Sequence, residues 1–305
     1  MIDTNASRLP PLLHEASVSG SVGSRDAVDE RPDAPTGYTR RAVRRWRNGR
    51  DEADQDCIAE EVPIAFVYNE RPHVVMMATP RDLDDFALGF SLSEAVIARA
   101  VELGEVTTQT LLEGIELRVR VPAARADVLE QRQRNLTGRT SCGLCGAQAL
   151  EDAMRQPPPV SGGPRIDARI LQRALAQLDA LQPLNAVTGA THAAAWARAD
   201  GSIVLLREDV GRHNALDKLI GAMARAGEDP QRGFLVITSR ASYEMVQKAA
   251  TVGVTLMAAI SAPTALAIHL AEETGVTLVG FARSASHVVY TRAERVAAAP
   301  PEEAA

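Results

Sequence analysis

The sequence is poor in cysteine, with three in 305 residues. So low and odd a number argues against a disulfide framework and favours a reducing compartment. Aromatic residues are also scarce, at 4 % of the chain, although hydrophobic residues together reach 46 %, enough for a sizeable core. A large core with few rings favours small aliphatic side chains packed tightly between helices and a sheet.

Signals for export and for membrane insertion are missing as well. Residues 1–13 contain no basic segment followed by an apolar core, so no secretory signal is expected. The most apolar stretch, 253–271, is interrupted by Ser261, Pro263 and His269, which favours a buried strand and helix over a membrane span. The formal net charge of -6 argues against a nucleic-acid coat. We therefore expect a cytoplasmic protein that binds neither membranes nor nucleic acids.

Composition divides the chain into five parts. Residues 1–37 are rich in Ser, Asp, Pro and Gly without periodicity, so we expect them to be disordered, like the tail 297–305. Residues 38–135 predict a small α/β unit and residues 165–296 a larger α/β domain. Between them, 136–164 are expected to form a mobile loop that carries a Cys-x-x-Cys motif.

The small unit is predicted to combine strands with one helix. Strands are expected at 38–47, 62–68, 73–77 and 115–121. Thr79 is expected to cap the helix and Pro80 to occupy its first turn, with apolar residues at helical spacing as far as Arg99. The arginines of 40–50 favour a solvated edge strand balanced by the acidic segment 51–61, rather than a docking patch for an acidic partner.

The second half alternates between strand and helix patterns. Strands are expected at 191–198, 202–206, 233–238, 254–260, 276–281 and 287–291, and helices at 167–181, 215–226, 242–252 and 263–274. This alternation predicts right-handed crossovers and a largely parallel sheet covered on both faces. In such folds, ligands bind at the carboxyl ends of the strands.

The loops at the predicted strand ends are rich in Ser, Thr, Arg and Gly. They are 207–214, 238–242, 261–264 and 281–286. Backbone N–H groups and guanidinium groups bind anions, so these loops predict a ligand that carries phosphate, such as a dinucleotide. Neither a Walker motif nor a GxGxxG motif is present, so neither standard loop holds this ligand.

Two of the three cysteines, Cys142 and Cys145, lie three residues apart, each followed by glycine. Residues 147–155 read as a short helix, which places the pair at a helix N-terminus close to Arg139. Both features lower the pKa of a thiol, and the thiolate is its reactive form. Half of a zinc site is the main alternative, but structural zinc takes four ligands and Cys57 is the only other thiol. The pair therefore predicts reactive, sulfur-handling thiols on a tether.

Seven motifs follow one another in a recognisable order. They are Glu61–Ile64, Met76–Pro80, Leu88–Glu94, Ser141–Gly146, Thr188–Ala194, Glu208–Lys218 and Ser239–Lys248. From about Thr39 to Arg295 the chain resembles the formate dehydrogenase accessory sulfurtransferases, the FdhD family. The resemblance implies a cytidine-deaminase-like, three-layer C-terminal domain and a homodimer. Asn69-Glu70 and Glu94-Ala95 stand where the family often has Asn-Gly and Glu-Gly, which puts the local turn geometry in question.

The resemblance also implies a function. Family members take persulfide sulfur from a cysteine desulfurase and deliver it to the bis(molybdopterin guanine dinucleotide) molybdenum cofactor that formate dehydrogenase requires. Cys142 matches the persulfide-forming cysteine and Cys145 its neighbour, and no metal is expected on protein side chains. The stretch matched to cofactor binding consists of Phe281, Ala282, Arg283, Ser284, Ala285 and Ser286. A thioredoxin-like dithiol oxidoreductase and a non-catalytic molybdenum-cofactor chaperone remain as alternatives.

Several other polar residues have either a structural or a functional role. Asp209, Arg212 and His213 form either a satisfied polar turn or a contact with cofactor phosphate or pterin, and Arg240 is a further candidate for phosphate. We expect Ser239 and Ser242 to cap a helix, Lys248 to lie on a solvated face, and His192 to be a structural strand residue. A zinc deaminase would need a Glu two residues after its histidine, and His192 is followed by Ala193 and Ala194.

Overall fold

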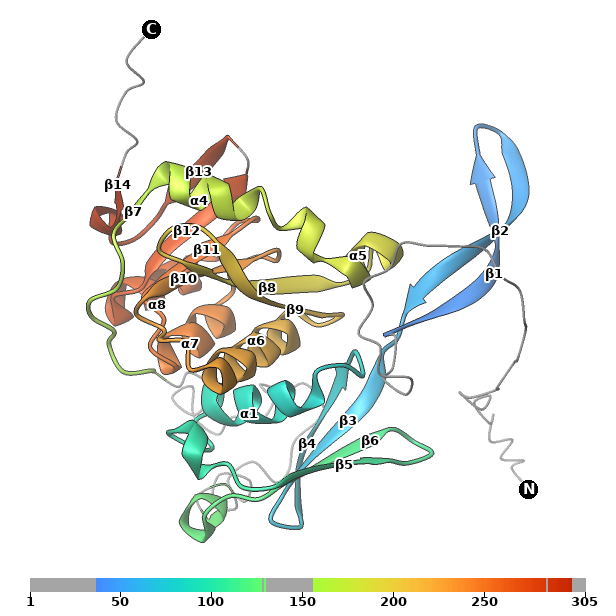
Figure 1. Cartoon of the computed structure of the whole chain (residues 1–305), viewed down its shortest axis with the longest axis horizontal. Helices are drawn as coiled ribbons and strands as arrows, with labels where there is room; N and C mark the ends of the chain where they lie inside the picture. The colour runs from blue at the N-terminus through green and yellow to red at the C-terminus, as the bar shows by residue number, and fades with distance from the viewer. Residues whose placement is uncertain (1–36, 128, 130–155, 284, 298–305) are drawn as a thin grey trace, which may run out of the picture. The chain divides into compact units, whose positions relative to one another are not determined.

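Two main sheets organise the chain. The computed structural model describes residues 37–127, 129, 156–283 and 285–297. A four-stranded sheet has the order β4-β3-β6-β5 and a six-stranded sheet the order β13-β12-β11-β10-β8-β9. Figure 1 labels the strands of both sheets. The α/β class predicted from the alternating pattern is confirmed. The predicted boundaries at 135 and 164 stay predictions, as does the mobility of the Cys-x-x-Cys loop, most of which lies outside the described residues.

The six-stranded sheet carries the larger core. Its strands are β8 (His192–Arg198), β9 (Ile203–Asp209), β10 (Gly233–Ile237), β11 (Leu256–Ala259), β12 (Thr277–Arg283) and β13 (Ser286–Val289). Only β10, β11 and β12 pair in parallel, whereas β8, β9 and β13 pair antiparallel. The prediction of a largely parallel sheet was therefore wrong for half of the strands. Short connections such as 199–202 join only antiparallel neighbours, whereas parallel pairing needs a long crossover.

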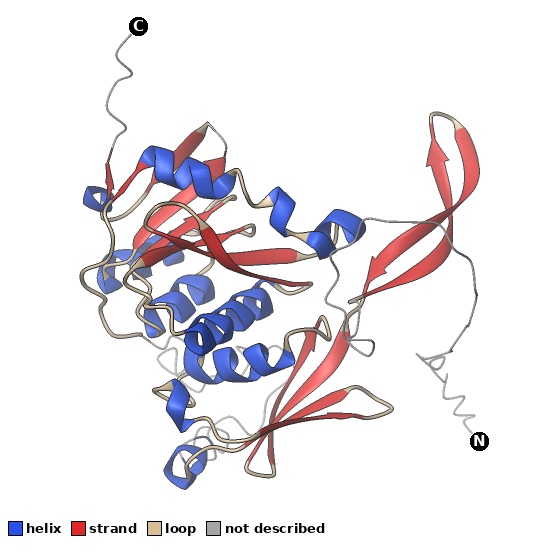
Figure 2. Ribbon diagram, in the orientation of Figure 1, coloured by secondary structure: helices blue, strands red, loops and turns tan. Residues whose placement is uncertain are grey.

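Helices cover both faces of this sheet (Figure 2). They are α4 (Ala168–Leu175), α5 (Pro183–Thr188), α6 (Arg212–Ala226), α7 (Tyr243–Thr251) and α8 (Ala265–Thr274). Buried residues of α6, α7 and α8 pack on one face, and Leu171 and Ala174 of α4 pack on the other. Three layers result, as predicted; whether they follow the cytidine-deaminase topology stays a prediction. The expected helix 167–181 ends earlier, at Leu175, and a separate 3-10 turn occupies Asp179–Leu181.

The smaller sheet packs on helix α1 (Leu83–Ser93). Its strands are β3 (Val62–Tyr68), β4 (Arg71–Ala78), β5 (Val106–Thr110) and β6 (Ile115–Val119). Three of the five phenylalanines meet in its core, where the ring centroid of Phe66 lies 5.0 Å from that of Phe86 and 4.4 Å from that of Phe90. The scarce aromatic residues are thus concentrated where one helix must fill the space over a whole sheet. Shorter elements are η1 (Ala100–Glu102), β7 (Ile166–Asp167), η3 (Ala293–Arg295) and β14 (Val296–Ala297).

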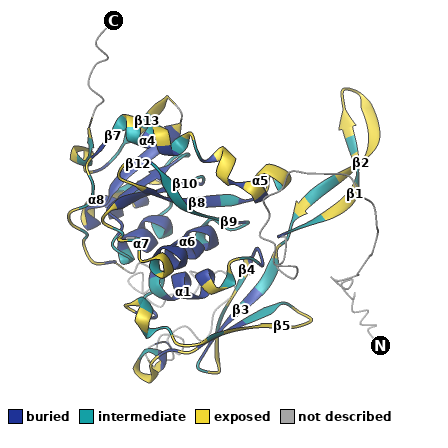
Figure 3. Cartoon of the chain, in the orientation of Figure 1, coloured by how far each residue is buried: buried dark blue, intermediate teal, exposed yellow. Residues whose placement is uncertain are grey.

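The arginine-rich segment forms a hairpin with the acidic one. Strand β1 (Tyr38–Arg47) pairs antiparallel with β2 (Arg50–Ala59), and most of both strands is exposed (Figure 3). Arg44 donates to Asp51 at 2.6 Å and Arg45 to Asp54 at 2.5 Å. Solvent screens such exposed pairs, so they balance charge more than they add stability. The acidic segment is thus a regular strand, which its composition did not predict.

Helix α1 begins later than predicted and ends earlier. Its N-cap is Asp82, which is in the left-handed region at φ 53° and makes no side-chain cap hydrogen bond. Thr79 is fully buried instead: its N–H donates to Asp209 and its hydroxyl accepts from the N–H of Val210. The predicted cap residue therefore joins the end of β4 to the end of β9.

Left-handed backbone occurs in the two short motifs where the resemblance implies a glycine. Asn69, Glu70 and Ala95 have φ values of 47°, 65° and 50°. Asn69 and Glu70 form the two-residue connection between β3 and β4, where a hairpin favours positive φ at both positions. The Asn69 side chain exchanges two hydrogen bonds with the backbone of Val121, which anchors the turn. These residues therefore adopt the positive φ that glycine favours, without being glycine.

Two glycines allow α1 and α6 to approach closely. A Cβ built on Gly89 would lie 1.7 Å from the carbonyl oxygen of Asp217, and one on Gly221 would lie 1.9 Å from that of Asp85. No side chain fits at such distances, so each backbone packs directly on the other helix.

We expect Gly89→Ala to lower the free energy of unfolding by about 3 kcal/mol, because α1 and α6 must separate to admit the methyl group. Urea denaturation followed by circular dichroism measures the effect. Gly104→Ala is the matched control: its Cβ would meet the Cβ of Arg120 at 3.0 Å, so the loss should be about 1 kcal/mol or less. Equal losses in the two variants would contradict the close helix packing.

Candidate functional site

Five strand ends meet at one edge of the six-stranded sheet. Strand β8 runs antiparallel to both β9 and β10, so β9 and β10 end where β8 begins; His192 pairs with Asp209. The loops after β10 and β11 are joined by the hydrogen bond from Thr264 N to Ala241 O, at 3.0 Å. The loop after β11 meets β12 where Phe281 N donates to Ser261 O, at 3.2 Å. The four loops predicted from the sequence therefore lie side by side. We call residues 192, 209–214, 238–244, 261–264, 281–283 and 285–287 the sheet-edge site.

The stretch predicted to bind cofactor ends β12 and begins β13. The register of the two strands shifts between Gly280 and Arg283, and within this irregularity Phe281 has a φ of 49°. Such backbone in a non-glycine residue costs about 1–3 kcal/mol. Ala282 is buried while Phe281, Arg283, Ala285 and Ser286 are exposed, and Ser284 lies outside the described residues. The irregular strand thus presents a ring and a guanidinium group to solvent at the sheet edge.

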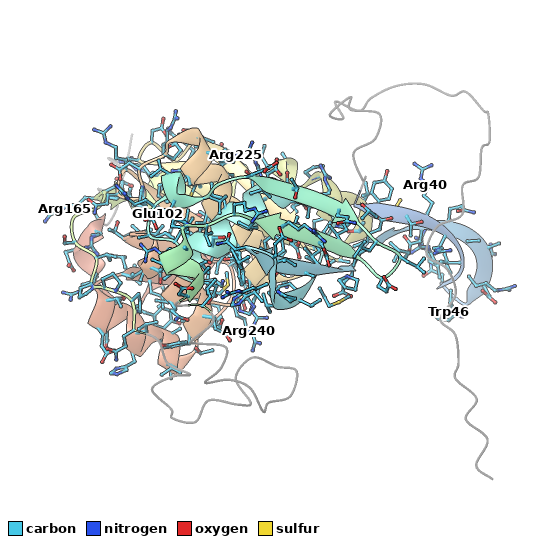
Figure 4. All side chains as sticks on the ribbon, turned by 90° about the horizontal axis from the view of Figure 1, so that it is seen from below. Arg40, Trp46, Glu102, Arg165, Arg225 and Arg240 are labelled. Carbon is cyan, nitrogen blue, oxygen red and sulfur yellow. The ribbon has the colours of Figure 1, made fainter. Side chains whose placement is uncertain are left out.

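Positive charge dominates the sheet-edge site of an acidic chain. Its sequence holds Arg212, Arg240 and Arg283 together with three histidines, whereas its carboxylates are Asp209 and Glu244. Arg240 is exposed, and its side chain projects outward in Figure 4. A cluster of this kind attracts anions such as phosphates.

Asp209 holds part of the site in place through a buried ion pair and several hydrogen bonds. Both Asp209 and Lys218 are completely buried, and their charged atoms lie 2.6 Å apart. Asp209 also accepts from the backbone N–H of Thr79 and of Gly211, and from the side chain of Asn214. Burial lowers the pKa of Lys218, and the Asp209 carboxylate opposes this shift. Asp209 therefore fixes the turn that precedes Arg212 and His213. This supports the structural role for Asp209 rather than a contact with a ligand.

Arg212 and His213 have polar atoms that the fold leaves unpaired. The Nε of Arg212 and the Nε2 of His213 are buried and have no hydrogen-bond partner among the described residues. The Nε2 of His213 does lie 3.0 Å from Glu244 Oε2, but not in line for a hydrogen bond. This imidazole, with Arg212 farther away, holds the pKa of Glu244 below its usual range, and burial lowers the pKa of His192. Unpaired donors beside an ionised carboxylate favour a ligand with both acceptors and donors.

Of the two predicted serine caps, Ser242 is confirmed in position and Ser239 is not a cap. Ser242 is the N-cap of α7, yet its hydroxyl donates to Glu244 Oε2 at 3.2 Å instead of accepting from the backbone. The hydroxyl of Ser239 donates to the carbonyl oxygen of Arg240. His192 lies in β8 as predicted, half-buried at its first position.

The prediction that Lys248 lies on a solvated face was also wrong. It is 5 % exposed and its Nζ contacts Asp217 at 2.9 Å, Glu94 at 2.7 Å and Ser93 at 3.1 Å. Burial alone would lower the pKa of Lys248, but these carboxylates more than reverse this and raise it. Lys248 follows the buried Met245 by three residues, so its position on the apolar face of α7 was the signal for burial.

The remaining predicted site residues, Cys142 and Cys145, lie outside the described residues. Cys57 is a free, half-buried thiol in β2.

Across the described ranges, no group of three or more His, Cys, Asp or Glu side chains could hold a metal ion. No helix in those ranges is both long enough and apolar enough to cross a membrane.

Comparison with known proteins places the chain in a family. Residues 59–297 match the model of the FdhD/NarQ family. The sulfur carrier protein FdhD of Xanthomonas euvesicatoria pv. vesicatoria (strain 85-10) is 56% identical over 256 residues, which cover 84% of this chain and 91% of that protein. The protein of the same name from Cupriavidus necator is 51% identical over 262 residues, covering 86% and 91%.

The fold agrees with this assignment. A crystal structure from Desulfotalea psychrophila, described as a formate dehydrogenase accessory protein, superposes with a TM-score of 0.66 at 22% identity. The match covers 85% of this chain and 99% of that one. With the family model spanning most of the sequence and close relatives along almost their whole length, the chain belongs to the FdhD/NarQ family.

Proposed function

We propose that this chain is a sulfur carrier that receives persulfide sulfur on Cys142 and delivers it to the bis(molybdopterin guanine dinucleotide) molybdenum cofactor of a formate dehydrogenase. The observation that carries the proposal is the sheet-edge site, which joins the stretch from Phe281 to Arg283 to the cationic loops after β9 and β10. The names of the relatives, sulfur carrier protein FdhD, support the sulfur chemistry.

Sulfur loading needs one nucleophile. The Cys142 thiolate attacks the outer sulfur of a persulfide on a cysteine desulfurase; the S–S bond of the donor breaks and the donor cysteine leaves as a thiolate. The product, Cys142–S–SH, keeps the sulfur bound in a labile form. Arg139, three residues earlier, favours the thiolate. Cys145 either releases the sulfur by forming a disulfide with Cys142 or tunes its reactivity.

The sheet-edge site supplies the other half of the activity. A cofactor with two guanine dinucleotides carries several phosphates, which the arginines and histidines of this site suit in charge. In this proposal the cofactor is a bound substrate, and the protein works as a cytoplasmic homodimer between a desulfurase and a formate dehydrogenase. The chain acts as a sulfurtransferase because the sulfur passes through its own cysteine.

Mass spectrometry tests the sulfur step directly. After incubation with cysteine and a cysteine desulfurase, the peptide that contains Cys142 should gain one sulfur atom, and a thiol reductant should remove it. Cys142→Ala should gain none, and Cys145→Ala should still be loaded. A reversible Cys142–Cys145 disulfide without added sulfur would favour a dithiol oxidoreductase and contradict the proposal.

A further inference from the structure

Resting on the function proposed above, we propose that Glu244 reads the guanine base of the bound dinucleotide and so determines which nucleotide the site accepts. The Watson–Crick edge of guanine presents two adjacent donors, the N1–H and the 2-amino group. A carboxylate offers two acceptor oxygens at a matching separation. Adenine has an acceptor at N1 and no 2-amino group, so the same carboxylate would repel its ring nitrogen.

The carboxylate of Glu244 is held in place. Its Oε2 accepts from the Ser242 hydroxyl at 3.2 Å and lies 3.0 Å from the Nε2 of His213. Both contacts involve the same oxygen, and no hydrogen bond to Oε1 is found among the described residues. The side chain is 39% exposed, so a ligand can reach it. A fixed carboxylate whose oxygens can accept further hydrogen bonds is suited to a base with two adjacent donors.

The charge of Glu244 is otherwise unfavourable at this position. Of the two carboxylates of the sheet-edge site, Asp209 is completely buried against Lys218. Glu244 alone therefore presents negative charge where Arg212, Arg240 and Arg283 would attract phosphates. Its pKa is lowered by His213 beside it, so it stays ionised at neutral pH and accepts only. An ionised carboxylate weakens phosphate binding, and recognition of a donor-rich base offsets that cost.

The position of Glu244 fits the dimensions of a nucleotide. It lies in the first turn of α7, the helix that follows β10 after the loop 238–242, and the stretch from Phe281 to Arg283 ends β12. One strand, β11, separates β10 from β12, so the two strand ends lie about 10 Å apart at the usual strand spacing. A base at Glu244 thus leaves its phosphates within reach of Arg283.

Calorimetric titration with guanosine, inosine and adenosine 5′-diphosphates tests this assignment. The wild-type protein should bind the guanosine form roughly tenfold more tightly than the inosine form, which lacks the 2-amino group, and discriminate more strongly against the adenosine form. Glu244→Gln should bring the guanosine-to-inosine ratio close to one, because its amide no longer offers two acceptors. Glu273→Gln is the matched control, since Glu273 also pairs with a histidine, His269, at 3.2 Å, on α8.

The contribution of His213 is measured with two variants of that residue. His213→Gln, whose amide keeps a polar N–H group beside Glu244, should retain more of the guanosine-to-inosine ratio than His213→Ala does. A Glu244→Gln variant with the wild-type ratio would overturn the inference and leave the sulfur function intact. A wild-type protein that binds guanosine diphosphate no better than the other two would overturn it as well. Persulfide loading of Cys142 is measured separately, so failure of the base assignment is distinguishable from failure of the carrier function.

Discussion

Replacing Cys142 by alanine is expected to lower the activity of the client formate dehydrogenase by more than about a hundredfold. Removing the nucleophile leaves no atom on which the transferred sulfur can travel, as with other covalent intermediates. The measurement is formate oxidation in extracts of a strain whose only copy of this protein carries the substitution. Client protein and cofactor content are quantified in parallel, because the defect should lie in the sulfur content of the cofactor alone.

Cys57→Ala is the matched control for this experiment. Cys57 is a free thiol in β2, in a hairpin strand rather than at the sheet-edge site. Its loss should leave client activity within about twofold of wild type. Full client activity in the Cys142→Ala strain would identify the protein as a cofactor chaperone without a covalent step.

Most elements were predictable because their patterns are local. The strands β8, β10, β11 and β12 and the helices α6, α7 and α8 lie within a few residues of their predicted ranges. The parallel order of the central strands followed from the helices between them. Strand β5, Val106–Thr110, was missed because four of its five residues are exposed and polar, so it shows no apolar alternation.

The start of α1 shows why a good local signal can fail. Thr79-Pro80 has the composition of a helix start, yet Thr79 is drawn into hydrogen bonds with Asp209 and Val210, more than a hundred residues away. Burial of a polar backbone group requires a partner, and the partner here belongs to another sheet. A tertiary requirement of this kind leaves no trace in a window of ten residues.

The candidate site was predictable in position and less so in the role of each residue. The strand-end rule located the loops, and the stretch predicted to bind cofactor lies among them. Asp209 and Lys248, however, are buried ion-pair residues, while Glu244 at the surface received no role from the sequence. Charged residues in a motif look alike whether they contact a ligand or support the residues that do. Burial separates the two cases.

Two adjacent residues of α6 illustrate this separation. Asp217 and Lys218 follow each other in the sequence, so their side chains point about 100° apart around the helix. Asp217 pairs with Lys248 of α7, and Lys218 pairs with Asp209 at the end of β9. Opposite charges side by side in the sequence thus serve two different buried pairs, which together tie α6 to its neighbours.

Replacing Lys218 by methionine is expected to lower the free energy of unfolding by about 3–5 kcal/mol. The variant leaves the Asp209 carboxylate in a completely buried position without its counter-charge, and it also removes the donor to the carbonyl oxygen of Thr79. Methionine matches the length of the lysine stem, so lost charge rather than a cavity dominates. Urea denaturation followed by circular dichroism measures the change, and the m-value shows whether unfolding stays two-state.

Three further variants separate this effect from a general disturbance of the fold. Arg44→Met removes one partner of the exposed pair with Asp51, so it should cost about 1 kcal/mol or less. Asp209→Asn combined with Lys218→Met removes both charges and should recover part of the loss, because no unpaired ion remains buried. Asp209→Asn is also measured alone, and a double variant as unstable as the sum of its two single variants would show that the two charges are not coupled. The turn that carries Arg212 and His213 would then be held by the hydrogen bonds that Asp209 accepts from the backbone and from Asn214.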